Sequence, residues 1–203
     1  QVKKEIEMKV KLVKVRLAFP AIWNAESVKQ PDGTMSAPKF GATALFAPDH
    51  PCVAEIKDKI RQVAKAKWAD KADAMLAALK EEGKICLRNG NGKPEYDGYP
   101  GNLYIKGSNK VRPLILDRDG ETPLAEADGV IYGGCYVNMM LDIWAQQNGW
   151  GKRINATLTG LQFHSKGDAF GAGAPATKDD FEDLGQEEGA LETAGGFDDD
   201  DFT

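Results

Sequence analysis

Tyrosines and basic residues lie close together in one stretch of the chain, residues 96–113. They are, in order, Tyr96, Tyr99, Tyr104, Lys106, Lys110 and Arg112. Single-stranded nucleic acid is bound by cationic side chains that neutralise phosphates and by aromatic rings that stack on bases, and this stretch supplies both. If residues 103–106 form a strand, Tyr104 and Lys106 lie on the same face of it. The pattern indicates a surface that binds single strands without reading their sequence.

Further candidates for this surface lie elsewhere in the chain. Tyr132 and Tyr136 flank Gly133 and Gly134, where a second backbone can approach closely. Basic residues also begin two of the expected strands. Because aromatic rings also fill cores, packing is the alternative role of each tyrosine. The predicted DNA-binding residues are Lys39, Tyr99, Tyr104, Lys106, Lys110, Arg112, Tyr132, Tyr136, Lys152 and Arg153.

Side chains suited to catalysis are few, and we do not expect an enzyme. The chain has two histidines, His50 and His164, and no Gly-x-Ser-x-Gly sequence. His50 falls at the start of an expected helix, which indicates a capping or surface role. Asp117 and Asp119 form a compact acidic pair that could hold magnesium in a nuclease. Their Asp-Arg-Asp-Gly sequence is more typical of a polar turn after a strand.

The cysteines give no sign of a metal site. Cys52, Cys86 and Cys135 are widely spaced and odd in number, without a Cys-x-x-Cys pair. We therefore expect no metal, no cofactor and no disulfide framework, and we expect a reducing compartment. No apolar run approaches the roughly 18 residues of a membrane-spanning helix, so no membrane association is expected.

Charge is distributed unevenly along the chain. Residues 168–203 contain twelve acidic residues and one lysine, a balance of −11, whereas residues 1–167 have a balance of +6. Apolar residues in the acidic stretch are too sparse to repay the entropy of ordering it, so a flexible tail is expected. Isolated phenylalanines among acids suit a docking motif for a partner protein, although a tail that only solubilises is the alternative. The predicted docking residues are Phe197, Asp198, Asp199, Asp200, Asp201 and Phe202.

The elements expected to position these residues are mostly strands. Alternation predicts strands at 9–19, 39–46, 103–106, 113–117, 135–145 and 153–163. Apolar residues change face near Leu12 and at Gly160, which indicates two β-bulges. Between residues 51 and 82 the apolar residues recur every three or four positions, which predicts a helical block with Asp49 as its N-cap.

Strands with one inserted helical block, and no regular alternation of strands and helices, are typical of a small barrel. The expected fold is mainly β with an inserted α-helix, an OB-fold β-barrel of five to six strands. The expected domains are an N-terminal extension at 1–8, the OB-fold domain at 9–167 and the acidic tail at 168–203.

Several motifs and their order resemble a family of phage single-stranded DNA-binding proteins. They are Gly98-Tyr99-Pro100-Gly101, Lys110-Val111-Arg112-Pro113, Ile131-Tyr132-Gly133-Gly134-Cys135-Tyr136-Val137 and Leu161-Gln162-Phe163, followed by a Gly-rich stretch and an acidic tail. The family is related to the OB-fold proteins of short-tailed coliphages. The resemblance implies DNA bound across the barrel face, a tail that recruits replication proteins, and a homodimer. Related tails end on an aromatic residue, whereas here Thr203 follows Phe202.

The expected function is to coat and protect single-stranded DNA during phage replication, recombination or repair, in the cytoplasm of the bacterial host. The tail is expected to compete with DNA for the basic surface and, once released, to bind a polymerase, helicase or nuclease. Two alternatives stay open. One is a protein-interaction or DNA-mimic module that acts through the tail, and the other is a metal-dependent nuclease that uses Asp117 and Asp119.

Overall fold

The computed structural model describes residues 8–30 and 32–171. The chain divides into two units, residues 1–172 and 173–203, and the fold described here is that of the first. The predicted docking residues 197–202 lie outside the described residues. Among the described residues, no helix has the length and apolar character needed to cross a membrane.

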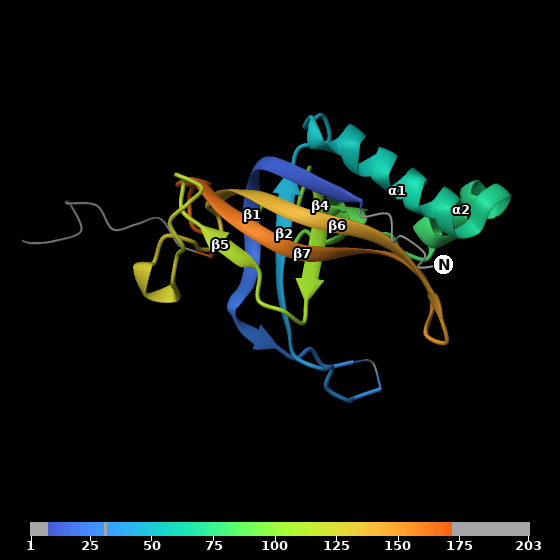
Figure 1. Cartoon of the computed structure of the whole chain (residues 1–203), viewed down its shortest axis with the longest axis horizontal. Helices are drawn as coiled ribbons and strands as arrows, with labels where there is room; N and C mark the ends of the chain where they lie inside the picture. The colour runs from blue at the N-terminus through green and yellow to red at the C-terminus, as the bar shows by residue number, and fades with distance from the viewer. Residues whose placement is uncertain (1–7, 31, 172–203) are drawn as a thin grey trace, which may run out of the picture. The chain divides into compact units, whose positions relative to one another are not determined.

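Seven strands form a single sheet in the order β3-β4-β2-β1-β6-β7-β5, and neighbours are antiparallel except β5 and β7. The strands are β1 (Lys9–Glu26), β2 (Lys39–Phe46), β3 (Leu87–Asn89), β4 (Leu103–Asn109), β5 (Leu114–Leu116), β6 (Tyr136–Asn148) and β7 (Gly151–Ser165) (Figure 1). The prediction of a mainly-β fold with an inserted helical block is confirmed. The sheet has seven strands rather than five or six because β3 has only three residues, too few to show alternation. The short strand expected at 113–117 is present as β5.

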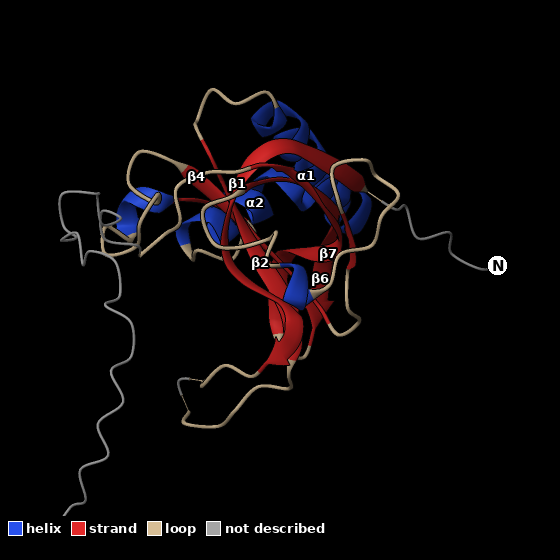
Figure 2. Ribbon diagram, turned by 90° about the vertical axis from the view of Figure 1, so that its left-hand side faces the viewer, coloured by secondary structure: helices blue, strands red, loops and turns tan. Residues whose placement is uncertain are grey.

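The sheet closes into a barrel where β4 meets β7. The side-chain amide of Asn109 donates to the Leu158 carbonyl at 3.0 Å. Gly107 makes this approach feasible, because a Cβ there would lie 2.5 Å from a methyl group of Leu141. Figure 2 shows the strands curling around the core, with α1 beside β1 and β6.

The helical block lies between β2 and β3 and consists of α1 (Cys52–Trp68), a 3-10 turn η1 (Ala69–Lys71) and α2 (Ala72–Glu81). The predicted apolar stripe of α1 is buried. The N-cap prediction for Asp49 was wrong, because the helix begins at Cys52 and its N-cap is Pro51, two residues after Asp49. The ring Nδ1 of His50 instead accepts from the Cys52 backbone N–H at 3.2 Å, so the capping role expected for His50 is confirmed.

Both predicted bulges are present. The register between β1 and β6 shifts between Leu12 and Val15, where Lys14 adopts a φ of 54°. The register between β6 and β7 shifts beside Gly160. Each shift turns the following apolar residues back toward the core, so both long strands keep one buried face around the bend.

Both ends of the barrel extend beyond the expected boundaries. Met8 is buried, its N–H donates to the Asp142 carboxylate at 3.1 Å, and it therefore belongs to the barrel rather than to an extension. Residues 168–171 were assigned to the tail, yet they also contact the barrel. The Phe170 N–H donates to the Gly133 carbonyl at 2.9 Å, and the Gly171 N–H donates to Asp97 Oδ2 at 3.0 Å.

Candidate nucleic-acid interface

A groove of about 650 Å³ crosses the barrel between β3, β4, the start of β2 and the β6–β7 hairpin. Its basic lining residues are Lys39, Lys84, Arg88, Lys93, Lys106, Lys110 and Arg153. The other lining residues are Cys86, Tyr104, Ser108, Asn109, Trp144, Gln146, Ile154, Asn155, Ala156 and Thr157. Seven cations and no carboxylate line this groove, so it attracts anions.

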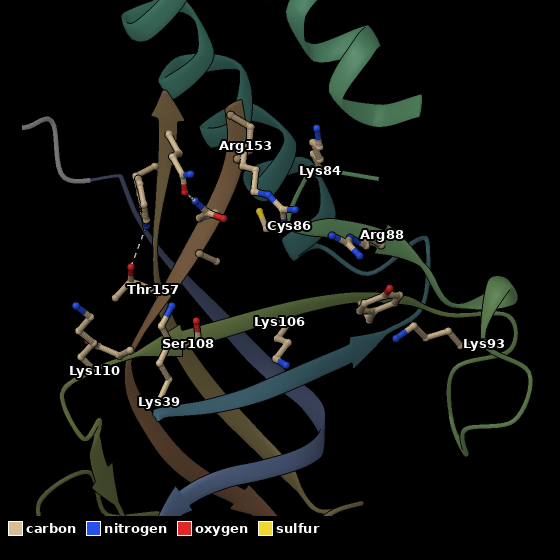
Figure 3. A pocket seen from close by; sticks show the side chains of 17 residues that line it. Lys39, Lys84, Cys86, Arg88, Lys93, Lys106, Ser108, Lys110, Arg153 and Thr157 are labelled. Carbon is tan, nitrogen blue, oxygen red and sulfur yellow. Dashed lines mark hydrogen bonds between the residues drawn. The ribbon is translucent and has the colours of Figure 1, made fainter. Parts of the chain in front are cut away.

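Strand pairing explains how residues far apart in the sequence reach one groove. In β4, Lys106 is exposed while its neighbours Ile105 and Gly107 are buried. Phe40 pairs with Asn109, which places Lys39 at the start of β2 near Lys110 at the end of β4. Figure 3 shows Lys106 between Lys39 and Lys110 on one side and Lys93 on the other.

The opposite wall of the groove is formed by two other parts of the sheet. Arg88 in β3 pairs with Tyr104 in β4, and Arg153 in β7 pairs with Gln146 in β6. Figure 3 shows Arg153, Lys84 and Arg88 along this wall. The cations thus surround the groove rather than following one strand.

Most of the groove's basic residues form no ion pair within residues 8–30 and 32–171. Lys84 forms an ion pair with Glu82 at 2.5 Å. The other six cations have no ion pair with any described residue. Like charges held this close repel one another, and an anion that binds among them relieves that repulsion. A polyanion of repeating phosphates fits this arrangement better than a single small anion.

The groove contains one exposed aromatic ring, that of Trp144. It is 42% exposed, and its indole N–H donates to the Thr157 hydroxyl at 3.0 Å. The neighbouring Asn155 side chain donates to Gln146 at 2.9 Å. Because these hydrogen bonds fix the wall around it, the ring is held in place with part of its surface free to stack on a base.

Five of the ten predicted DNA-binding residues line this groove. They are Lys39, Tyr104, Lys106, Lys110 and Arg153. Tyr104 is only 7% exposed, and the Lys93 ammonium lies 5.5 Å from its ring centroid. Tyr104 therefore forms part of the groove floor and presents little surface for stacking.

The other five predicted residues lie outside the groove lining. Tyr99 is 2% exposed, packs with Ala18 and Leu45, and has its pKa raised by burial. A ring so covered has no face to offer a base, so the stacking role predicted for Tyr99 gives way to core packing. Arg112 lies over the Trp23 ring at 5.2 Å, and Lys152 adjoins Arg153 without lining the groove.

Tyr136 begins β6, and Tyr132 lies just before this strand. The Tyr132 hydroxyl donates to the Gly167 carbonyl at 2.8 Å. Tyr136 pairs with Arg16 and with Ser165, and its ring lies close to Gly167. In this structure both rings contact the segment that leads to the tail, not the groove.

Among the basic and exposed aromatic residues of the groove, sequence reasoning missed Lys84, Arg88, Lys93 and Trp144. Trp144 had a usable signal, because it occupies the outward position of a clearly alternating strand. Lys84 and Arg88 flank the start of the three-residue strand β3, and Lys93 follows a 3-10 turn, η2 (Gly90–Gly92). Nothing local in the sequence indicates that these residues meet β7.

The acidic pair forms a turn, as expected. Both the Glu121 and Thr122 N–H groups donate to Asp119 Oδ1 at 2.9 Å. The Thr122 hydroxyl donates to Oδ2, and these hydrogen bonds lower the pKa of Asp119. Asp117 accepts from the Arg118 N–H at 2.6 Å. Both carboxylates stabilise the polar turn after β5.

An OB-like barrel crossed by a cationic groove with an exposed tryptophan is characteristic of proteins that bind oligonucleotides. Residues 8–191 match the family described as the single-stranded DNA-binding protein of Enterobacter phage Enc34. The chain belongs to this family, which confirms the resemblance to phage single-stranded DNA-binding proteins.

Individual relatives agree with this assignment. Protein p50 of Acyrthosiphon pisum secondary endosymbiont phage 1 is 40% identical over 184 residues, which cover 89% of this chain and 96% of p50. The bacteriophage Enc34 single-stranded DNA-binding protein, solved in complex with single-stranded DNA, is 23% identical with a TM-score of 0.65, covering 80% of this chain and 89% of that one. The bacteriophage T7 single-stranded DNA-binding protein gp2.5 is 12% identical with a TM-score of 0.52, covering 91% and 98%. Both solved structures share the fold.

Proposed function

We propose that this protein binds single-stranded DNA in the groove between β4 and the β6–β7 hairpin, without strong sequence preference. The observation that carries the proposal is the groove lining, with seven basic side chains and no carboxylate. Phosphates would be neutralised by the basic residues, and a base would stack on Trp144. Stacking tolerates any base, because every base has a π-face.

Family membership supports the same ligand. The family carries the name of a single-stranded DNA-binding protein, and a relative with the same fold was solved with single-stranded DNA. Duplex DNA would expose phosphates but no free base face to Trp144, so the single strand is the better ligand. We propose binding without catalysis and without a cofactor.

We further propose that binding coats and protects single strands during phage DNA replication, recombination or repair, in the cytoplasm of the bacterial host. The acidic tail would compete with DNA for the groove and, when displaced, recruit a polymerase, helicase or nuclease through Phe197 or Phe202. Phe170 supports a tail that starts nearby, because its ring packs on a cluster that includes the groove residue Tyr104. We also propose a homodimer, which sedimentation of the purified protein tests directly.

The test is a titration of fluorescently labelled oligo-dT followed by anisotropy, at several salt concentrations, with duplex as competitor. Lys106→Glu should weaken binding at least about tenfold, since it places a carboxylate at the centre of the groove. Lys57→Glu is the matched control, because Lys57 is an exposed lysine of α1 that does not line the groove. Equal affinities of the wild type and Lys106→Glu would refute the groove as the DNA site. An absence of binding by every variant would favour a partner-docking module that acts through the tail.

A further inference from the structure

Trp150 occupies the turn between β6 and β7 and is 91% exposed. Burial of an indole ring is favourable, and an exposed ring lacks this stabilisation. No packing partner among the described residues explains why a tryptophan occupies this position. The backbone of the turn is stabilised without the ring, because the Trp150 N–H donates to the Asn148 side-chain oxygen at 3.0 Å. The backbone at Trp150 does not have a positive φ and imposes no side-chain type, so the fold itself does not call for tryptophan here.

The hairpin that carries Trp150 also forms one wall of the DNA groove. Gln146 and Arg153 pair across the hairpin, and both line the groove. Two further pairs, Gln147 with Lys152 and Asn148 with Gly151, lead from there to the turn. Figure 1 shows this turn (orange) projecting beyond the neighbouring strands.

The surroundings of Trp150 favour a polyanion. Residues 143–167 contain no Asp or Glu, whereas Lys152 and Arg153 follow Trp150 after a single glycine. Gly149 and Gly151 flank the tryptophan, and a Cβ at either glycine would meet nothing within 4 Å. The turn is therefore open on all sides, and the glycines allow the ring to be reoriented toward a ligand.

We propose that Trp150 is a second base-stacking residue, which extends the binding site beyond the groove along the β6–β7 hairpin. This inference rests on the proposed function. One nucleotide stacks on Trp144 inside the groove, and a later nucleotide of the same strand stacks on Trp150 at the tip. Lys152 and Arg153 lie between the two rings along the hairpin and neutralise the intervening phosphates.

The test compares Trp150→Ala and Trp150→Phe with the wild type on oligo-dT of increasing length. On strands long enough to reach the turn, Trp150→Ala should lose about tenfold in affinity and Trp150→Phe much less, because phenylalanine keeps an aromatic face. The salt dependence should stay the same, since stacking neutralises no phosphate. On strands that fill only the groove, all three proteins should bind alike. Met35→Ala is the matched control, a 60% exposed apolar residue that does not line the groove.

Intrinsic fluorescence gives a second readout. The chain has four tryptophans, Trp23, Trp68, Trp144 and Trp150, and stacked bases quench indole emission. Long oligo-dT should quench the tryptophan emission of Trp150→Phe less than that of the wild type. The difference is the part of the quenching that Trp150 contributes.

Two outcomes would overturn the inference while leaving the proposed function intact. One is equal affinity of Trp150→Ala and the wild type on every strand length. The other is loss of self-association by Trp150→Ala without DNA, which would assign the ring to a contact between subunits. If the wild type itself does not bind oligo-dT, the proposed function fails instead.

Discussion

The guanidinium carbon of Arg16 lies 4.3 Å from the centroid of the Phe170 ring. The same guanidinium donates to the Asp168 carbonyl at 2.8 Å and to the Gly134 carbonyl at 3.3 Å. One arginine of β1 therefore fastens the segment 167–171 to the barrel by a cation–π contact to Phe170 and a hydrogen bond to Asp168, while its hydrogen bond to Gly134 holds the guanidinium in place. The contacts with the barrel continue to Gly171, four residues beyond the last expected position of the barrel domain.

Loss of the Arg16 side chain should destabilise the protein. Arg16→Ala removes the cation–π contact and both hydrogen bonds, and we expect the free energy of unfolding to fall by about 1–2 kcal/mol. Chemical denaturation measures this change. Lys11→Ala, an exposed lysine of the same strand, should leave the stability unchanged. Equal stabilities of the two variants would show that Arg16 does not hold the segment in solution.

Two truncations should separate the tail from the segment that packs on the barrel. Removal of residues 172–203 takes away eleven of the twelve acidic residues of the tail but leaves Phe170 in place. It should tighten oligo-dT binding at low salt, since a competing polyanion is lost, and leave the Tm unchanged. Removal of residues 168–203 should also lower the Tm by about 3–6 °C, because it uncovers the cluster around Tyr99. Unchanged affinity of both truncations across salt concentrations would refute the competing tail.

Gly134 should not tolerate a side chain. Its φ is 109°, and a Cβ there would lie 2.1 Å from the Asp168 carbonyl oxygen. Gly134→Ala should lower the free energy of unfolding by on the order of 2–3 kcal/mol, since both the backbone conformation and the close approach are lost. Gly149→Ala is the control, because a Cβ there has no neighbour within 4 Å. A stable Gly134→Ala would mean that residues 167–171 leave the barrel at little cost.

The cationic groove should show in the salt dependence of binding. The logarithm of the affinity falls with the logarithm of the salt concentration. Removing one phosphate contact to a single strand makes this slope less steep by about 0.7. We expect this change for Lys106→Ala and no change for Lys57→Ala on α1. Anisotropy titrations at four or more salt concentrations measure both slopes. Identical slopes for Lys106→Ala and Lys57→Ala would mean that Lys106 does not contact the phosphates.

Stability should fall in alkaline solution because of buried thiols. Burial raises the pKa of Cys52 and of Cys86 from 9.0 to about 12. Above pH 9 the unfolded chain therefore binds fewer protons than the folded chain, and the free energy of unfolding decreases until about pH 12. Each thiol contributes a slope of about 1.4 kcal/mol per pH unit at most. The free energy of unfolding of Cys86→Ala should decline less steeply with pH than that of the wild type. An identical decline in both proteins would mean that other groups cause it.

The local pattern of the sequence predicted the parts of the fold that depend on local chemistry. Alternation located most strands because each has one buried face. The changes of apolar parity near Leu12 and Gly160 located both bulges, since a bulge shifts the alternation by one residue. The strand β3 was missed because its three residues carry no periodic signal.

The nature of the binding surface was also readable from composition. The uneven distribution of charge, and the closeness of tyrosines and basic residues within residues 96–113, pointed to a polyanionic ligand. Among the candidates, Lys106 and Arg153 line the groove. Charged side chains are rarely buried without a partner, because burial removes them from water. A basic residue in a strand therefore indicates the face of the strand that points outward.

Only the tertiary structure decided which aromatic residues face the ligand. Tyr99 and Trp144 both follow sequence patterns compatible with stacking, yet Tyr99 is buried and Trp144 is exposed. Burial of a ring depends on what packs against it, and Tyr99 packs against residues of β1 and β2 that are distant in the sequence. Likewise, Lys84 and Arg153 share a groove only because the sheet closes on itself. By itself the sequence determined the charge and the strand periodicity, and these favoured a polyanionic ligand. The closure of the barrel determined which of these side chains meet.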